Sequence, residues 1–156
     1  MALPKVKKGD VFSIELTQGF GLIQCVEESS GDEVEFYRAL PGSYDKIEDA
    51  MLDELVRQKE LFFSNMPMRY ALKNKDISFL GNSEIPEGSE VPKYFRTKHV
   101  VRSNYLGWHI VDRFTLNRRL VENLSTEEQS LSGWGSISIP DLVERIENNW
   151  TPMEWT

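Results

Sequence analysis

Cysteine and histidine side chains often carry nucleophilic and acid–base chemistry, and this chain has Cys25, His99 and His109. The two histidines are ten residues apart, which does not match the i, i+4 spacing of a helical zinc site, and one cysteine makes no cysteine-rich cluster. Cys25 lies in the apolar run 22–26, where burial raises a thiol pKa and favours packing. A cysteine and a histidine that are distant in sequence can still meet in space. We nevertheless expect no metal site and no catalytic residue.

The glycine pairs and the carboxylates do not form a catalytic or cofactor-binding motif either. The segments Gly19-Phe20-Gly21 and Gly133-Trp134-Gly135 lack the third glycine and the strand–loop–helix context of a dinucleotide fingerprint. The acidic clusters fall in predicted turns, on outward strand faces or on a helix exterior, so no pair shows the contrast that separates a general acid from its base. We therefore expect no cofactor and no enzymatic activity.

The first part of the chain predicts a β-hairpin. Alternation of apolar and polar residues over 11–16 is typical of a half-buried strand, and Gly19 can supply the positive φ of a tight turn. The more apolar run 20–26 predicts a strand in the middle of a sheet. A third strand follows around Phe36, with Tyr37 on its opposite, polar face. A meander is the simplest connection between these strands.

Further strands are expected at 61–63, 77–80, 106–112 and 116–124, the last of which could instead be a short helix. Apolar residues at helical spacing predict two helices, near 46–59 and 139–150, and residues resembling a capping box precede each. The chain should thus have an α+β fold, with a curved, mainly antiparallel sheet that could form a partly open barrel. Because no repeat, low-complexity tract or linker interrupts it, residues 1–156 should form a single domain.

Charge and composition narrow the class of protein. The 25 acidic and 18 basic residues give a formal net charge of −7, which disfavours phosphate backbones and suits either a basic partner or solubility alone. The apolar runs are far shorter than the roughly 20 residues of a membrane span. The N-terminus lacks the apolar segment of a secretory signal, and one cysteine can form no intramolecular disulfide. We expect a cytoplasmic protein that binds neither membrane nor nucleic acid.

Two segments stand out as candidate binding surfaces. Residues 93–98, with Arg102, interleave cations and aromatic rings, a composition compatible with RNA or with an acidic protein partner. A solvated strand edge is the simpler interpretation of this stretch. Residues 84–92 contain two prolines, a glycine and three glutamates, and long exposed loops of this kind often bind partners.

Three segments also carry a resemblance to a known family. The opening Gly9-Asp10-Val11-Phe12-Ser13-Ile14, the following Gly19-Phe20-Gly21 with its apolar strand, and Gly107-Trp108-His109-Ile110 after the proline-rich loop resemble the immunity protein 26 family of bacterial polymorphic toxin systems. The resemblance implies a small cytosolic protein that binds the toxin domain of its own system and blocks it by occlusion, without catalysis. The acidic balance is compatible with a basic toxin, such as a nuclease.

Charge and expected exposure then select the residues that would contact the toxin domain: Glu28, Asp32, Asp49, Asp53 and Glu54. Two other classes of function remain open. One is a small ligand-binding domain or enzyme with a pocket near Trp108, His109 and the loop 84–92. The other is an RNA-binding module built on residues 93–102, which the negative net charge disfavours.

Overall fold

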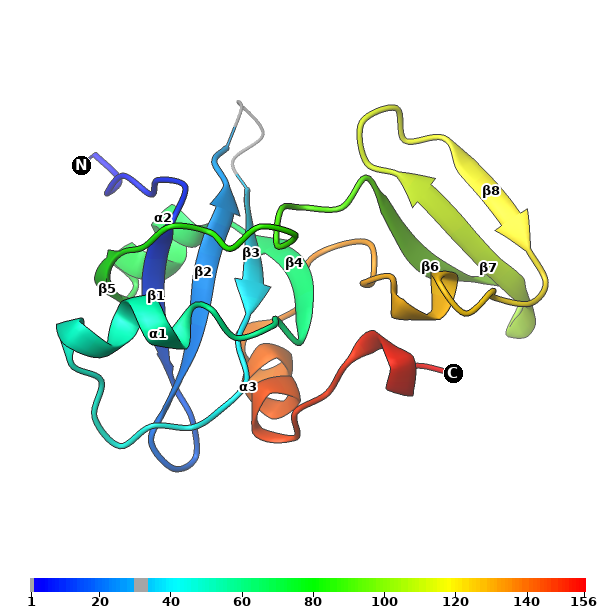
Figure 1. Ribbon diagram of the computed structural model, residues 1–156. Coiled ribbons are helices and arrows are strands. Elements are labelled where there is room, and N and C mark those ends of the chain that lie inside the picture. The colour runs from blue at the N-terminus through cyan, green and yellow to red at the C-terminus, as the bar shows by residue number, and fades with distance from the viewer. Residues whose placement is uncertain (1, 30–33) are drawn as a thin grey trace. The chain divides into compact units, whose positions relative to one another are not determined.

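The structure is a computed structural model that describes residues 2–29 and 34–156 (Figure 1). Within these residues the chain forms eight strands, which pair antiparallel in two open sheets of five and three strands, together with three α-helices. The predicted α+β class and the mainly antiparallel pairing are confirmed. The strands are divided between two sheets, whereas the sequence pattern suggested one.

The chain forms two compact units. Unit 1 comprises Met1–Val91 and Ser136–Trp150, and unit 2 comprises Pro92–Gly135 and Thr151–Thr156. The division does not test whether each unit folds alone, so the single domain expected over 1–156 stays a prediction. Each unit is described by itself below.

Unit 1 contains the five-stranded sheet, in the order β4-β3-β2-β1-β5. Its strands are β1 (Asp10–Glu15), β2 (Phe20–Glu27), β3 (Glu35–Ala39), β4 (Phe62–Met66) and β5 (Ile77–Asn82). The predicted hairpin is confirmed, because β1 pairs antiparallel with β2, and Gly19 in its turn has a φ of 75°. A Cβ atom at Gly19 would lie 2.6 Å from the carbonyl oxygen of Tyr44, so only glycine fits there. The apolar strand β2 is central, as expected.

Both faces of this sheet are covered. One face packs with α2 (Met68–Lys73) and α3 (Ile139–Glu147) around a core that includes Phe12, Ile23 and Tyr37. The other face packs with α1 (Leu52–Leu55), whose Leu52 joins Val11, Leu22 and other residues in a second core. Burial on both faces explains why the placement of Tyr37 on an outer, polar face is wrong, since its side chain is fully buried.

The two predicted helices are present but shorter than the sequence pattern suggested. In place of 46–59 the structure has the 3₁₀ turn Asp49–Met51 followed by α1, and Glu48 caps this segment without a side-chain hydrogen bond. In place of 139–150 it has α3, which begins at the expected cap, because the Ser138 hydroxyl accepts a hydrogen bond from the backbone N–H of Asp141. None of the helices in the described residues is long and apolar enough to cross a membrane.

Unit 2 contains the three-stranded sheet, in the order β6-β7-β8. Its strands are β6 (Tyr94–Val101), β7 (Asn104–Asp112) and β8 (Arg118–Val121), and two 3₁₀ turns, Glu128–Ser130 and Pro152–Glu154, accompany them. The strand preferred over a helix within 116–124 is confirmed, as is the strand at 106–112. His109 lies between Thr97 and Leu120 in the strand register, and its neighbours Trp108 and Ile110 in β7 are buried on the opposite face.

Candidate functional site

The residues predicted to contact a partner lie on different elements of unit 1. Asp49, Asp53 and Glu54 are exposed on the 3₁₀ turn and α1, and Glu28 is exposed just after β2. Asp32 lies outside the described residues. The structure therefore groups three of the five residues on one short helical segment and places Glu28 at a separate site.

Asp53 shares an open recess of about 460 Å³ with the beginning of the loop 84–92. Its carboxylate accepts a hydrogen bond of 2.6 Å from the Ser83 hydroxyl, which ties α1 to the segment after β5. Glu84 and Glu87, both exposed, line the same recess, and Arg57 is the one cation among its lining residues. The tertiary structure thus joins two acidic segments that the sequence presented as separate features.

Trp108, around which the sequence predicted a pocket, is buried and does not line an open pocket. Trp108 is only 4% exposed, because the guanidinium of Arg96 lies 4.4 Å from its ring centre and the Trp155 ring lies 4.8 Å away. The indole is occupied by packing within unit 2. The other half of that predicted pocket, the loop 84–92, contributes instead to the acidic recess of unit 1.

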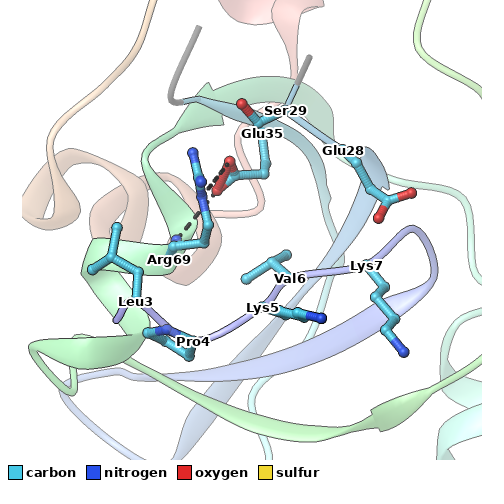
Figure 2. Close-up of a pocket in the computed structure, with 9 residues that line it drawn as sticks. All are labelled: Leu3, Pro4, Lys5, Val6, Lys7, Glu28, Ser29, Glu35 and Arg69. Atoms are coloured by element: carbon cyan, nitrogen blue, oxygen red, sulfur yellow. Dashed lines mark hydrogen bonds and ion pairs between the residues drawn. The ribbon is translucent and has the colours of Figure 1, made fainter. Parts of the chain in front are cut away.

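A second cavity of unit 1, of about 650 Å³, is an open space beside Glu28 (Figure 2). The N-terminal segment supplies one wall, with Lys5, Val6 and Lys7, and Figure 2 shows Glu35 and Arg69 lying against each other across from it. Glu35 belongs to β3 and Arg69 to the first turn of α2. Three elements that are far apart in sequence therefore meet around this cavity.

The Glu35 carboxylate is 1% exposed, and Arg69 is its cationic partner. One carboxylate oxygen accepts a hydrogen bond of 3.2 Å from the backbone N–H of Arg69. The other oxygen lies 3.4 Å from Arg69 Nε, an ion-pair distance, yet neither atom makes a hydrogen bond with the described residues. Burial raises the pKa of Glu35, and its contacts with Arg69 partly oppose that rise.

The cation-rich stretch 93–102 contains β6 (Tyr94–Val101), so the expectation of a strand in this segment is confirmed. Arg96, however, is fully buried and does not belong to a solvated edge. On the opposite face of β6, the His99 ring stacks on the His109 ring with centroids 4.4 Å apart. Burial, His99 and Arg118 together lower the pKa of His109.

Cys25 and the acidic and histidine side chains lie where they form neither an accessible nucleophile nor a metal site within the described residues. Cys25 is fully buried in the core of unit 1, and burial raises the pKa of its thiol to about 12, so it carries no thiolate at neutral pH. Among the described residues no group of three or more His, Cys, Asp or Glu side chains is placed to hold a metal ion.

Sequence reasoning missed Glu35 and Arg69, the paired residues of the cavity beside Glu28. Glu35 sits in an alternating stretch where a charged residue normally faces water, and Arg69 lies in a segment with no clear periodicity. The burial of Glu35 arises because α2 covers the end of β3, which no local pattern indicates.

None of the comparisons, with protein-family models, with curated proteins or with solved structures, found a match for this chain.

Proposed function

We propose that this chain is an immunity protein that binds a cognate bacterial toxin domain in the cytoplasm and neutralises it by occlusion, without catalysis. The observation that supports this proposal best is the acidic recess of unit 1. There Asp53 of α1 lies with Glu84 and Glu87 of the following loop, and Asp49 and Glu54 are exposed on the same helical segment. A surface of this kind complements a basic protein domain.

Charge distribution across the chain supports the same surface. Unit 2 contains seven of the 18 basic residues and five of the 25 acidic residues, so its formal net charge is +2 while that of unit 1 is −9. A strong field of one sign raises the rate at which an oppositely charged partner is captured. A basic toxin would therefore be drawn to unit 1.

If the gene lies beside one for a large secreted protein with a variable C-terminal domain, the function is tested by co-expression of this protein with that domain. Rescue of growth together with co-purification of the two chains is the expected result. Toxicity that is unchanged by this protein, with the protein present at normal levels, would contradict the proposal.

The surface is tested by charge reversal in Asp49→Lys with Glu54→Lys. Both residues are exposed, and Asp53 is left unchanged because it holds Ser83. We expect association at low salt to slow about tenfold and to depend less on salt, as measured by stopped-flow or surface plasmon resonance. Asp141→Lys with Glu144→Lys on α3 is the matched control, since it changes the net charge equally at another exposed site. Equal slowing by the two double variants would remove α1 from the interface.

A further inference from the structure

The cavity beside Glu28 is lined by Arg69, whose guanidinium contacts an acidic partner through only one of its three nitrogens. Arg69 contacts Glu35 through its backbone N–H and through Nε. The two terminal nitrogens of the guanidinium make no hydrogen bond with any residue that the structure describes. The Arg69 side chain is 30% exposed and lines the cavity, so these donors are accessible from it.

The buried Glu35 carboxylate holds the Arg69 guanidinium in place at the cavity. Burying Glu35 carries a desolvation cost that the 3.4 Å contact with Nε offsets only in part, because neither atom forms a hydrogen bond there. An arginine that contacts its carboxylate through Nε still has two terminal nitrogens, which form a planar fork of donors. That fork matches the geometry of a carboxylate or phosphate group.

The remaining walls of the cavity carry more cations than exposed carboxylates and also supply apolar surface. Glu28 is the one exposed carboxylate among the described lining residues. Lys5 and Lys7 are exposed on the N-terminal segment and add two further cations, in a unit whose net charge is strongly negative. Leu3, Pro4 and Val6 supply apolar surface. The volume of about 650 Å³ lies within the range of sites for small molecules, roughly 300 to 1,000 Å³.

We propose that this cavity is a binding site for a small oxyanion with an apolar portion, in which the outer nitrogens of Arg69 bind the anionic head, Lys5 and Lys7 contribute charge, and Leu3 and Val6 contact the apolar portion. The head is a carboxylate or a phosphate, since a guanidinium fork binds both. The site is separate from the acidic recess, and the proposal does not rest on the immunity function, although the cavity shares Glu28 with the predicted toxin contacts.

The test is a titration of the full ¹⁵N-labelled chain with sodium acetate, sodium benzoate and sodium phosphate at pH 7. Sodium chloride at matched ionic strength is the reference. Saturable shifts are expected at the amides of Lys5, Val6, Lys7 and Arg69. Tighter binding of benzoate than of acetate would assign the head as a carboxylate with an apolar attachment, and tighter binding of phosphate would assign a phosphate head.

Arg69→Gln should weaken the binding about tenfold or more, because one charge-assisted interaction is lost. Arg57→Gln, the same change beside the acidic recess, is the matched control and should leave the affinity unchanged. Lys5→Ala with Lys7→Ala alters only exposed side chains and provides a second variant should Arg69→Gln disturb the fold. Shifts equal to those produced by sodium chloride, or binding that is unaffected by both the Arg69 and the lysine variants, would overturn the proposal.

Discussion

Each compact unit of this protein buries one arginine completely, and the two guanidinium groups are stabilised by different partners. In unit 1, Arg38 of β3 donates to the Glu60 carboxylate at 3.0 Å and to the side-chain oxygen of Gln24 at 2.7 Å. It also donates to the carbonyl oxygens of Val56 and Gln58, at 3.0 and 2.5 Å. Every nitrogen of this guanidinium therefore has an acceptor, and a carboxylate neutralises its charge.

In unit 2, Arg96 of β6 makes no contact with a carboxylate of any described residue. Its guanidinium lies 4.4 and 4.8 Å from the ring centres of Trp108 and Trp155. It donates to four backbone carbonyls, those of Gln129, Leu131, Pro152 and Trp155. The faces of the indole rings and the carbonyl oxygens all present negative partial charge to the cation.

The difference shows that a buried arginine needs negative potential and complete hydrogen bonding, and that a carboxylate is only one source of them. In both units the arginine also connects elements distant in sequence. Arg38 ties β3 to the segment after α1, while Arg96 ties β6 to the last residues of the chain. Burial lowers the pKa of each guanidinium, and for Arg38 the Glu60 carboxylate opposes that shift.

The largest effect is expected from Arg38→Met. It leaves Gln24 and the nearly buried Glu60 without their partner, so the free energy of unfolding should fall by about 3–5 kcal/mol. Urea denaturation measures the loss, and hydrogen exchange with mass spectrometry should localise it to unit 1. The exposed Arg57→Met is the control and should change stability by no more than about 0.5 kcal/mol. A loss below about 1 kcal/mol for Arg38→Met would mean that the ion pair between Arg38 and Glu60 contributes little to the free energy of unfolding.

A smaller effect is expected from Trp155→Ala, which removes one of the two rings beside Arg96. The stability of unit 2 should fall by about 2 kcal/mol, since a desolvated cation–π contact is worth about that amount. Hydrogen exchange across β6 and β7 is the measurement. Met153→Ala, a neighbouring residue that is 52% exposed, serves as the control and should have little effect. Equal protection of β6 in the two variants would show that the Trp155 ring contributes little, and that the Trp108 ring and the carbonyl acceptors are enough to hold Arg96.

The smallest effect is expected from Glu35→Gln. In the pair of Glu35 with Arg69 the carboxylate is the more buried member, whereas in the pair of Arg38 with Glu60 it is the arginine. Burial raises the pKa of Glu35 in the folded state, so its ionisation destabilises the fold, and stability from this group is lost as pH rises through that pKa. At pH 7 the variant should be at least as stable as the wild type. This advantage should shrink as the pH is lowered to 4. Urea denaturation at both pH values measures it, and an advantage that grows on acidification would contradict the assigned cause.

Local patterns in the chain were enough to predict most of the fold. The alternation in β1, the glycine turn at Gly19 and the serine cap of α3 are decided by neighbours a few residues away, so each could be read from the sequence. The short α1 segment was overestimated because apolar spacing does not show where a helix stops. The six-residue α2 was missed because it is too short for a periodic signal.

The candidate sites could be predicted only in part, for a physical reason. Exposed acidic residues such as Asp49 and Glu54 follow from composition and expected helical spacing. The recess that joins Asp53 to Glu84, and the pair formed by Glu35 and Arg69, depend on contacts between distant segments.

The sequence by itself determined the class of fold, the central position of the apolar strand β2 and the excess of negative charge, because these depend on local periodicity and on residue counts. The tertiary structure decided which polar residues are buried. A local pattern assigns the charged residues Arg38, Arg96 and Glu35 to the surface, yet each is covered. Each has at least one partner 20 or more residues away, namely Gln58, Trp155 and Arg69 in turn. A charge can be buried only where the folded chain supplies opposite charge and hydrogen bonds, and that arrangement exists only once the distant segments have met.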